Sequence, residues 1–348
     1  MEQRLGGAAV LEKSARKHKA LRRRRGVRDA TGLLRLSLMY GPGGQSLRST
    51  AALASAAGIA ELSDVGVLRR LRGAGDWLEA LCQERFAQIA RALAPRVATR
   101  PIRLIDGSRI EGPGATGWRL HLCFAPEEGR MVQAAITPLK QGERLDRLAA
   151  GPGELWIGDR GYPQPDGLRA TLAAGADVLV RLTWNSLRLI DAKQRPLDWP
   201  RLFEKAARRG RLDMAVRVTR ARGSFKPLPL RLVVIRKPLR AADTARRKAQ
   251  RASQKGQHRK TDPRTLAGAG FLILLTSLDR KAWSPRRLGK LYGVRWQVEL
   301  AIKRMKSLLH IDELRAKDPA LARAWLYAHL LFALQTEAVA AALDTEPP

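Results

Sequence analysis

The chain has 348 residues, of which 45% are hydrophobic, so it can bury a substantial core and is not disordered throughout. Its 65 Lys and Arg residues outnumber its 32 Asp and Glu residues, and the net charge of +33 favours a polyanionic partner, above all nucleic acid. The two cysteines, Cys82 and Cys123, exclude a disulfide framework and a cysteine metal cluster, and they suit a reducing cytosol.

The first part of the chain, residues 1–98, predicts an α-helical DNA-binding domain. A basic run that ends at Arg25 is either a helix or arm lying against phosphates or a solubilising tail. Residues 94–101 read as a linker to the next domain.

Residues 46–72 predict two short helices joined by a turn at Gly58, with Ser49 and Ser63 as helix caps. The second helix ends in a basic cluster that contains Arg69 and Arg70, which we expect to contact DNA. This is a helix-turn-helix pattern, although other small helical bundles share it. A longer amphipathic helix over residues 76–93 is expected to buttress the pair.

Residues 99–184 predict the first part of an α/β core. The expected elements are three successive strands over residues 102–110, 118–124 and 131–139, then a strand over 154–162, a helix over 163–175 and a strand over 177–183. Three meandering strands followed by alternating strand and helix is the order of a ribonuclease-H-like fold.

A β-rich, strongly basic insertion domain is expected over residues 185–268. Within it, residues 240–265 are nearly free of large apolar side chains and predict a loop or an exposed helix. Residues 269–348 then predict the second part of the catalytic core, opening with a buried strand over Phe271–Leu278.

Four polar residues share one side of a predicted helix: Tyr292, Arg295, Glu299 and Lys306. At 3.6 residues per turn they fall within an arc of about 60°, beside an apolar stripe that faces the core. Taken alone, the pattern equally fits a solvated amphipathic helix with an Arg–Glu pair that contributes tenths of a kcal/mol.

Two aspartates follow apolar strand segments, Asp106 after residues 102–105 and Asp159 after residues 155–158. We expect each to lie at the carboxyl end of a core strand and to converge with Glu299. Three such acids can hold two divalent ions, one activating a water or a 3′ hydroxyl and one stabilising the leaving oxygen. Mg²⁺, or Mn²⁺ in its place, suits these hard oxygen ligands. The alternative is that the aspartates are ordinary turn residues.

The segments IRLIDGS and IGDRGY, with the spacing Tyr292-x2-Arg295-x3-Glu299-x6-Lys306, resemble the DDE transposases of insertion-sequence family four, which include the transposon Tn-five enzyme. The gap of about 140 residues between Asp159 and Glu299 is similar to the one in which that family inserts a β-rich domain. The resemblance covers most of the chain and is weakest before Ala94.

The resemblance implies that Asp106, Asp159 and Glu299 bind two metal ions and that Tyr292, Arg295 and Lys306 contact DNA phosphate near the cleaved end. Phe271 aligns with a base-stacking tryptophan of the Tn-five enzyme, with core packing as its alternative. Arg160 and Tyr162 are further DNA-contact or supporting groups, again with packing as the alternative.

The resemblance predicts a transposase that binds the terminal inverted repeats of double-stranded DNA, frees 3′ hydroxyls through a hairpin intermediate and joins them to target DNA, acting as a homodimer. A non-catalytic DNA-binding protein or repressor derived from a transposase, and a simple nuclease, are the alternatives. The apolar segment Ala324–Leu343 predicts a packed or dimer-forming helix and no membrane span, because it carries three polar or charged residues. No signal peptide is recognised, so we expect a cytoplasmic protein.

Overall fold

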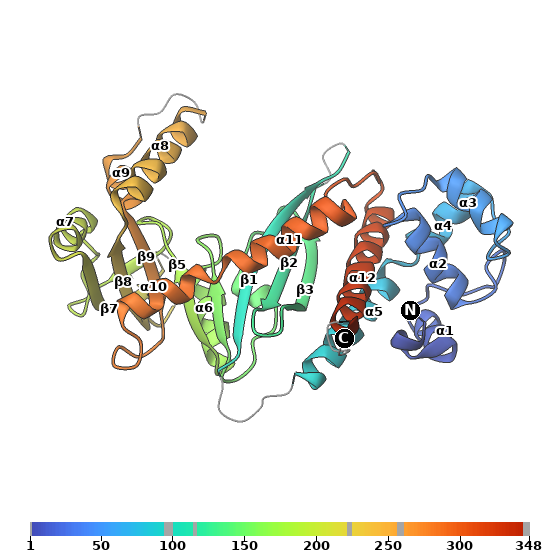
Figure 1. The fold of residues 1–348 in the computed structure, drawn as a ribbon, viewed down its shortest axis with the longest axis horizontal. Helices are drawn as coiled ribbons and strands as arrows, with labels where there is room; N and C mark the ends of the chain where they lie inside the picture. Colours follow the sequence, from blue (N-terminus) through green and yellow to red (C-terminus); the bar gives the residue numbers. More distant parts are fainter. Residues whose placement is uncertain (1, 94–99, 114–116, 221–224, 256–260, 344–348) are drawn as a thin grey trace.

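The computed structural model describes residues 2–93, 100–113, 117–220, 225–255 and 261–343. The molecule is elongated, with a group of N-terminal helices at one end and a large twisted sheet occupying the middle and the other end (Figure 1). Most of the predicted linker, residues 94–99, lies outside the described residues.

The N-terminal region is helical, as predicted. Its helices are α1 (Gly7–Lys17), α2 (Ala30–Tyr40), α3 (Leu47–Ala56), α4 (Asp64–Arg72) and α5 (Gly75–Ala92), after a 3₁₀ turn over Gln3–Leu5. The predicted helix pair is α3 and α4, which pack together around Gly58 in the left-handed conformation, φ +63°. Ser63 caps α4 as expected by accepting from the Gly66 N–H. Ser46, not Ser49, caps α3, because its hydroxyl accepts from the Ser49 N–H.

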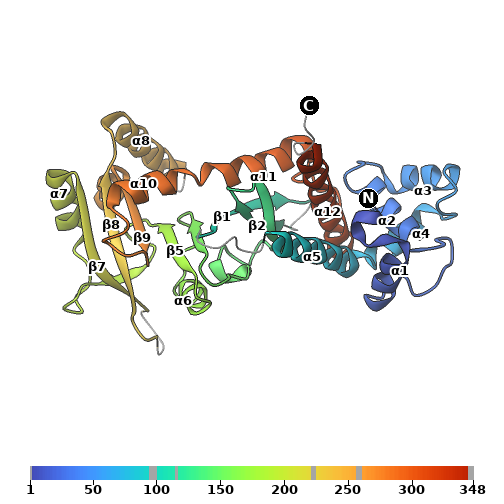
Figure 2. The same ribbon diagram turned by 60° about the horizontal axis from the view of Figure 1, so that its bottom comes forward.

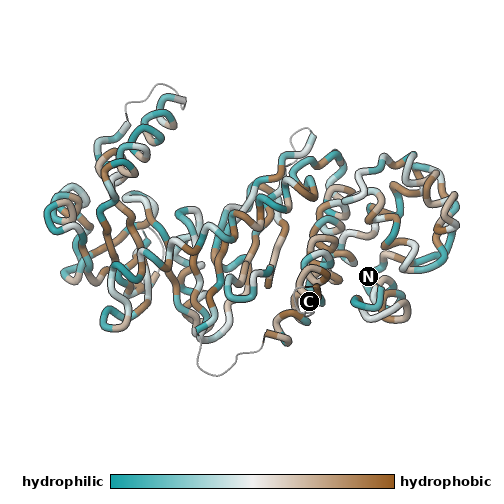
Figure 3. The backbone as a smooth tube through the Cα atoms, in the orientation of Figure 1, coloured by the Kyte–Doolittle hydropathy of each residue, from teal (hydrophilic) through white to brown (hydrophobic). Residues whose placement is uncertain are grey.

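The prediction that α5 buttresses the α3–α4 pair is wrong, because α5 packs mainly along α12 (Pro319–Leu343) and against the edge of the sheet. Helix α12 also contacts α2 and α4, so it joins the helical end of the molecule to the sheet. By length and composition α12 could cross a membrane, but half of its most apolar window is buried in the molecule. Figure 3 colours many residues of α12 as hydrophobic where the helix runs between the sheet and the N-terminal helices. This packing favours the intramolecular role over a dimer interface.

One mixed sheet holds the described strands in the order β3-β2-β1-β4-β5-β9-β8-β7-β6. The strands are β1 (Ile102–Glu111), β2 (Gly117–Ala125), β3 (Arg130–Pro138), β4 (Leu155–Gly158), β5 (Asp177–Arg181), β6 (Arg188–Ile190), β7 (Arg211–Thr219), β8 (Leu228–Arg236) and β9 (Phe271–Thr276). β1 to β3 form the predicted antiparallel meander, and β4 and β5 run parallel to β1. This arrangement is consistent with a ribonuclease-H-like core.

The basic insertion adds strands to that same sheet, since β9 pairs with both β5 and β8. The remaining helices are α6 (Pro165–Ala173), α7 (Trp199–Arg209), α8 (Leu239–Lys255), α9 (Pro263–Ala269), α10 (Pro285–Gly293) and α11 (Trp296–Leu309), with a 3₁₀ turn over Leu145–Arg147. Helix α7 was not predicted. Asp198 starts it by accepting from the Arg201 N–H, and Trp199 and Phe203 bury one face. The segment expected to be a loop or exposed helix is largely the exposed helix α8.

The two faces of the sheet bury separate apolar clusters, because successive strand side chains point to opposite faces. Ile157 and Leu179 belong to the cluster shared with α11, α12 and the N-terminal helices. Trp156 and Val180 belong to the cluster shared with α6 and α7. Figure 2 shows α10 and α11 following one another along the sheet, and α10 contacts β8 while α11 contacts β1 and β2.

Candidate active site

Asp106 and Asp159 are neighbours on adjacent parallel strands. The register pairs Ile105 of β1 with Gly158 of β4; Asp106 is the next residue of β1, and Asp159 directly follows the last residue of β4. Asp106 was predicted to lie at the carboxyl end of its strand. This is wrong, because β1 continues to Glu111 in pairing with β2. Asp106 directly follows Ile105, the last residue of β1 that pairs with β4.

Backbone amides hold both aspartates. Asp106 Oδ1 accepts from the Gly107 N–H at 2.9 Å, and Asp159 Oδ1 accepts from the Gly161 N–H at 2.6 Å. Such bonds fix the carboxylates before any ligand arrives.

Glu299 comes from a helix that is broken where one continuous helix was predicted. Helix α10 ends at Gly293, α11 begins at Trp296, and Arg295 lies at the junction. Between them the chain makes i→i−3 hydrogen bonds, such as Arg295 N–H to the Tyr292 carbonyl at 3.2 Å, in place of the α-helical pattern. The tighter turn places Tyr292 and Glu299 on different helices, while the predicted apolar stripe of α11 still faces the core.

The Arg295 guanidinium bridges the acids. Nη1 donates to Asp106 Oδ2 at 3.2 Å, and Nη2 is hydrogen-bonded to Glu299 Oε1. The Arg295 side chain is only 12% exposed, whereas that of Glu299 is 52% exposed. Arg295 therefore takes the place of a counter-cation between one strand acid and the helix acid.

The acids perturb one another. Burial raises the pKa of Asp106 to about 6, Arg295 and the Gly107 N–H oppose that rise, and the nearby charges of Asp159 and Glu299 add to it. Loss of hydration is therefore the main cause of the raised pKa, and the two like charges are a smaller one. Within the described part of the chain, however, no three His, Cys, Asp or Glu side chains are spaced to hold a metal ion as they stand.

Comparison with known proteins decides the family. Residues 98–334 match the family model described as the transposase DDE domain. The chain belongs to the DDE transposase family. The putative transposase InsL for insertion sequence element IS186A of Escherichia coli strain K12 is 37% identical over 350 residues, which span 99% of this chain and 94% of that protein. The transposase for insertion sequence element IS421 of Escherichia coli is 37% identical with the same coverage. This DDE transposase is accordingly a metal-dependent enzyme that acts on DNA.

Two predicted DNA-contact residues of the transposase are engaged within the protein. Tyr292 is 9% exposed, its hydroxyl has no hydrogen-bond partner among the described residues, and its ring centroid lies 5.9 Å from the Arg295 guanidinium carbon. Lys306 lies near the end of α11, with Nζ 3.6 Å from Asp312 Oδ2. Tyr292 thus lies beside Arg295, and Lys306 lies beside Asp312, an acid whose place a DNA phosphate could take.

Phe271 and Arg160 lie in different environments. Phe271 is buried at the start of β9 and stacks on Phe203, with ring centroids 5.3 Å apart, which favours core packing over base stacking. Arg160 is exposed beside Asp159 and makes no hydrogen bond or ion pair with another described residue.

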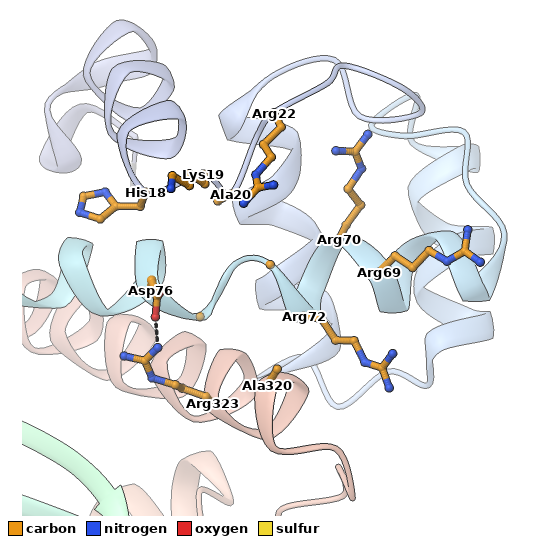
Figure 4. A pocket seen from close by; sticks show the side chains of 12 residues that line it. His18, Lys19, Ala20, Arg22, Arg69, Arg70, Arg72, Asp76, Ala320 and Arg323 are labelled. Carbon is orange, nitrogen blue, oxygen red and sulfur yellow. Dashed lines mark hydrogen bonds and ion pairs between the residues drawn. The ribbon is translucent and has the colours of Figure 1, made fainter.

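A basic cavity of about 580 Å³ lies where the end of α1, the α4–α5 junction and α12 meet (Figure 4). Arg69 and Arg70 line it, as do His18, Lys19, Arg22, Arg72, Asp76 and Arg323. Some of these basic side chains already have partners within the protein. Arg323 pairs with Asp76, Arg72 lies 3.0 Å from Asp318, and Arg70 donates to the Arg25 carbonyl.

Sequence reasoning missed two residues beside the aspartates. Glu143, between β3 and the 3₁₀ turn, pairs with Arg119 of β2 and approaches Gly107 and Gly161. Its sequence context, a Glu in a polar Gly- and Arg-containing turn, carried no signal for this position.

Proposed function

We propose that this DDE transposase is an insertion-sequence transposase of the family-four, Tn-five-like kind, which cuts and joins DNA at terminal inverted repeats. Asp106, Asp159 and Glu299 would be the ligands of two Mg²⁺ ions. The main support is that Asp106 and Asp159 are adjacent in register and that Arg295 ties Glu299 to the first of them.

The chemistry of these residues fits divalent metal. Carboxylate oxygens are the donors that Mg²⁺ prefers. Burial is the main cause of the raised pKa of Asp106, and the charges of Asp159 and Glu299 add to it, a like-charge contribution that a bound cation would offset. When bound, the ions would activate the attacking oxygen and stabilise the leaving one. Arg295 must first leave its bridging position, so that Glu299 can turn toward the aspartates.

Binding of DNA would draw Arg295 away from the acids. A phosphate offers the guanidinium two oxygens in place of its two carboxylate partners, and such a fork is a strong charge-assisted contact. Tyr292 packs beside Arg295 and would guide it, and Lys306 would exchange Asp312 for a second phosphate. Binding of the DNA end would thereby release the acids for metal.

The N-terminal helical region would bind the DNA at a second place, at a distance from the catalytic acids. Support comes from the α3–α4 pair and from the basic cavity that Arg69 and Arg70 line. Arg69, Arg22 and Lys19 make no ion pair with a described acid, so they are available for phosphates. We further propose that the active assembly is a homodimer on two DNA ends and that the protein acts in the cytoplasm.

The test is Mg²⁺-dependent cleavage of DNA that carries the element ends, by wild type and by Glu299→Gln. Glu313→Gln is the matched control, because Glu313 lies just beyond α11 and, among the described residues, pairs only with His310. We expect cleavage and strand joining by wild type and Glu313→Gln and none by Glu299→Gln. Equal cleavage by all three proteins would show that Glu299 is not a catalytic residue. Specific DNA binding without cleavage would favour a repressor. Cleavage without joined products would favour a nuclease.

A further inference from the structure

Glu143 occupies the space left by two glycines that adjoin the catalytic aspartates. A Cβ on Gly107 would lie 2.9 Å from Glu143 Oε1, and a Cβ on Gly161 would overlap Oε2. The same position at Gly161 lies 3.4 Å from Asp159 Oδ1. Glycine at these two places leaves room for the Glu143 carboxylate, and the Glu143 and Asp159 carboxylates approach the same point beside Gly161.

Arg119 orients the Glu143 carboxylate from β2. The guanidinium pairs with Oε1, and both side chains are largely covered, at 15% and 23% exposure. Burial raises the pKa of Glu143, Arg119 opposes the rise, and Asp159 adds to it. Oε1 is thus paired with Arg119, and Oε2 lies toward Gly161.

The Tyr162 hydroxyl gives an independent indication of a missing polar ligand here. Tyr162 has no exposed surface, and its hydroxyl has no hydrogen-bond partner in the described part of the chain. That oxygen lies 3.1 Å from the position of a Cβ on Gly107, and after burial its electrostatic neighbours are Glu143, Asp106 and Asp159. Burying a hydroxyl without a hydrogen-bond partner is unfavourable, so its position at this cluster points to a polar ligand.

We propose that Glu143 is a fourth acidic residue of the active site, which contributes an oxygen with Asp159 to a divalent cation whose bound water the Tyr162 hydroxyl meets. This inference rests on the proposed metal-dependent function. It differs from a purely structural role, in which Glu143 would serve only as the counter-ion of Arg119 and would not affect metal affinity.

Arg295 holds Asp106 and Glu299 but makes no hydrogen bond to Asp159 or Glu143 in the described part of the chain, so the oxygens of these two residues are open to a cation before DNA binds. Mn²⁺ binding to the full-length chain without DNA, followed by electron paramagnetic resonance of free Mn²⁺, therefore separates these roles. We expect Glu143→Gln to weaken Mn²⁺ affinity by at least about 10-fold, because a lost ligand should cost no less than a lost outer partner of a ligand. Tyr162→Phe should weaken the affinity by a smaller factor. Glu111→Gln is the matched control, since Glu111 ends the same strand as Asp106, is exposed and lies 3.7 Å from Arg109. Its affinity should equal that of wild type.

Thermal melting without metal checks the fold of each variant. If Glu143→Gln melts early because Arg119 is left unpaired, the double variant Arg119→Gln/Glu143→Gln removes both charges and takes over the test. If the well-folded Glu143 variant binds Mn²⁺ as tightly as wild type, the inference about Glu143 is overturned. The proposed function stands in that case as long as DNA cleavage still requires Glu299. Absence of both Mn²⁺ binding and cleavage in wild type defeats the proposed function itself.

Discussion

Glu337 connects the long helix α12 to the edge of the sheet. Its Oε2 accepts from the Met131 N–H of β3 at 3.1 Å. Burial raises the pKa of this carboxyl to about 7, although the Met131 bond and the charges of Arg130 and Arg304 lower it. We predict that Glu337→Gln, which keeps an acceptor for Met131 but cannot ionise, stabilises the protein at high pH.

The magnitude follows from proton linkage. The folded-state pKa is raised, so the folded chain binds more protons, and the stability from the neutral acid is fully present below the unfolded pKa of 4.5 and lost as pH rises through about 7. At about 1.4 kcal/mol per pKa unit, the wild type loses up to about 3 kcal/mol over this range. The Gln variant does not, so its advantage should be small at pH 5 and approach about 3 kcal/mol at pH 8.

Urea unfolding of both proteins at pH 5, 6, 7 and 8 measures the difference, and hydrogen exchange of the β3 amides locates it at the contact with α12. Glu84→Gln is the control, because Glu84 is exposed on α5 and should show no pH-dependent difference. A Glu337→Gln advantage that stays constant from pH 5 to pH 8 would refute the reasoning.

Three further predictions concern DNA binding, the active site and the insertion. Arg69→Ala should reduce the slope of log binding constant against log salt by about 0.9, measured by fluorescence anisotropy on duplex DNA; an unchanged slope would place Arg69 outside the interface. Gly161→Ala should lower Mg²⁺-dependent cleavage about 100-fold by displacing the acids, while Gly142→Ala, which meets open space, should retain it; equal rates would contradict this. Arg231→Met should lower the free energy of unfolding by about 3 kcal/mol, because it leaves Asp213 in a largely buried site with only the more exposed Arg280. Urea unfolding checks this last prediction, and a change below about 1 kcal/mol would argue against it.

Local patterns in the sequence were enough to predict most elements of the catalytic core. The strands β1 to β5 and the helix α6 were expected in their order, because apolar runs and turn residues act over a few neighbouring positions. Ser63 was identified as a cap for the same reason. The candidate acids were found because Asp106 and Asp159 each follow such an apolar run and Glu299 has a recognisable spacing to its neighbours.

Tertiary structure alone decided how these residues meet. Arg295 contacts Asp106, which is 189 positions away in the chain. The Glu143 carboxylate lies beside Gly107 and Gly161 because neither of them has a side chain. The break between α10 and α11 and the stacking of Phe271 likewise depend on what the folded sheet presents to them. Helical periodicity and turn propensity are set by adjacent residues, whereas contacts between distant charges depend on the packing of whole elements, which no short stretch of sequence encodes.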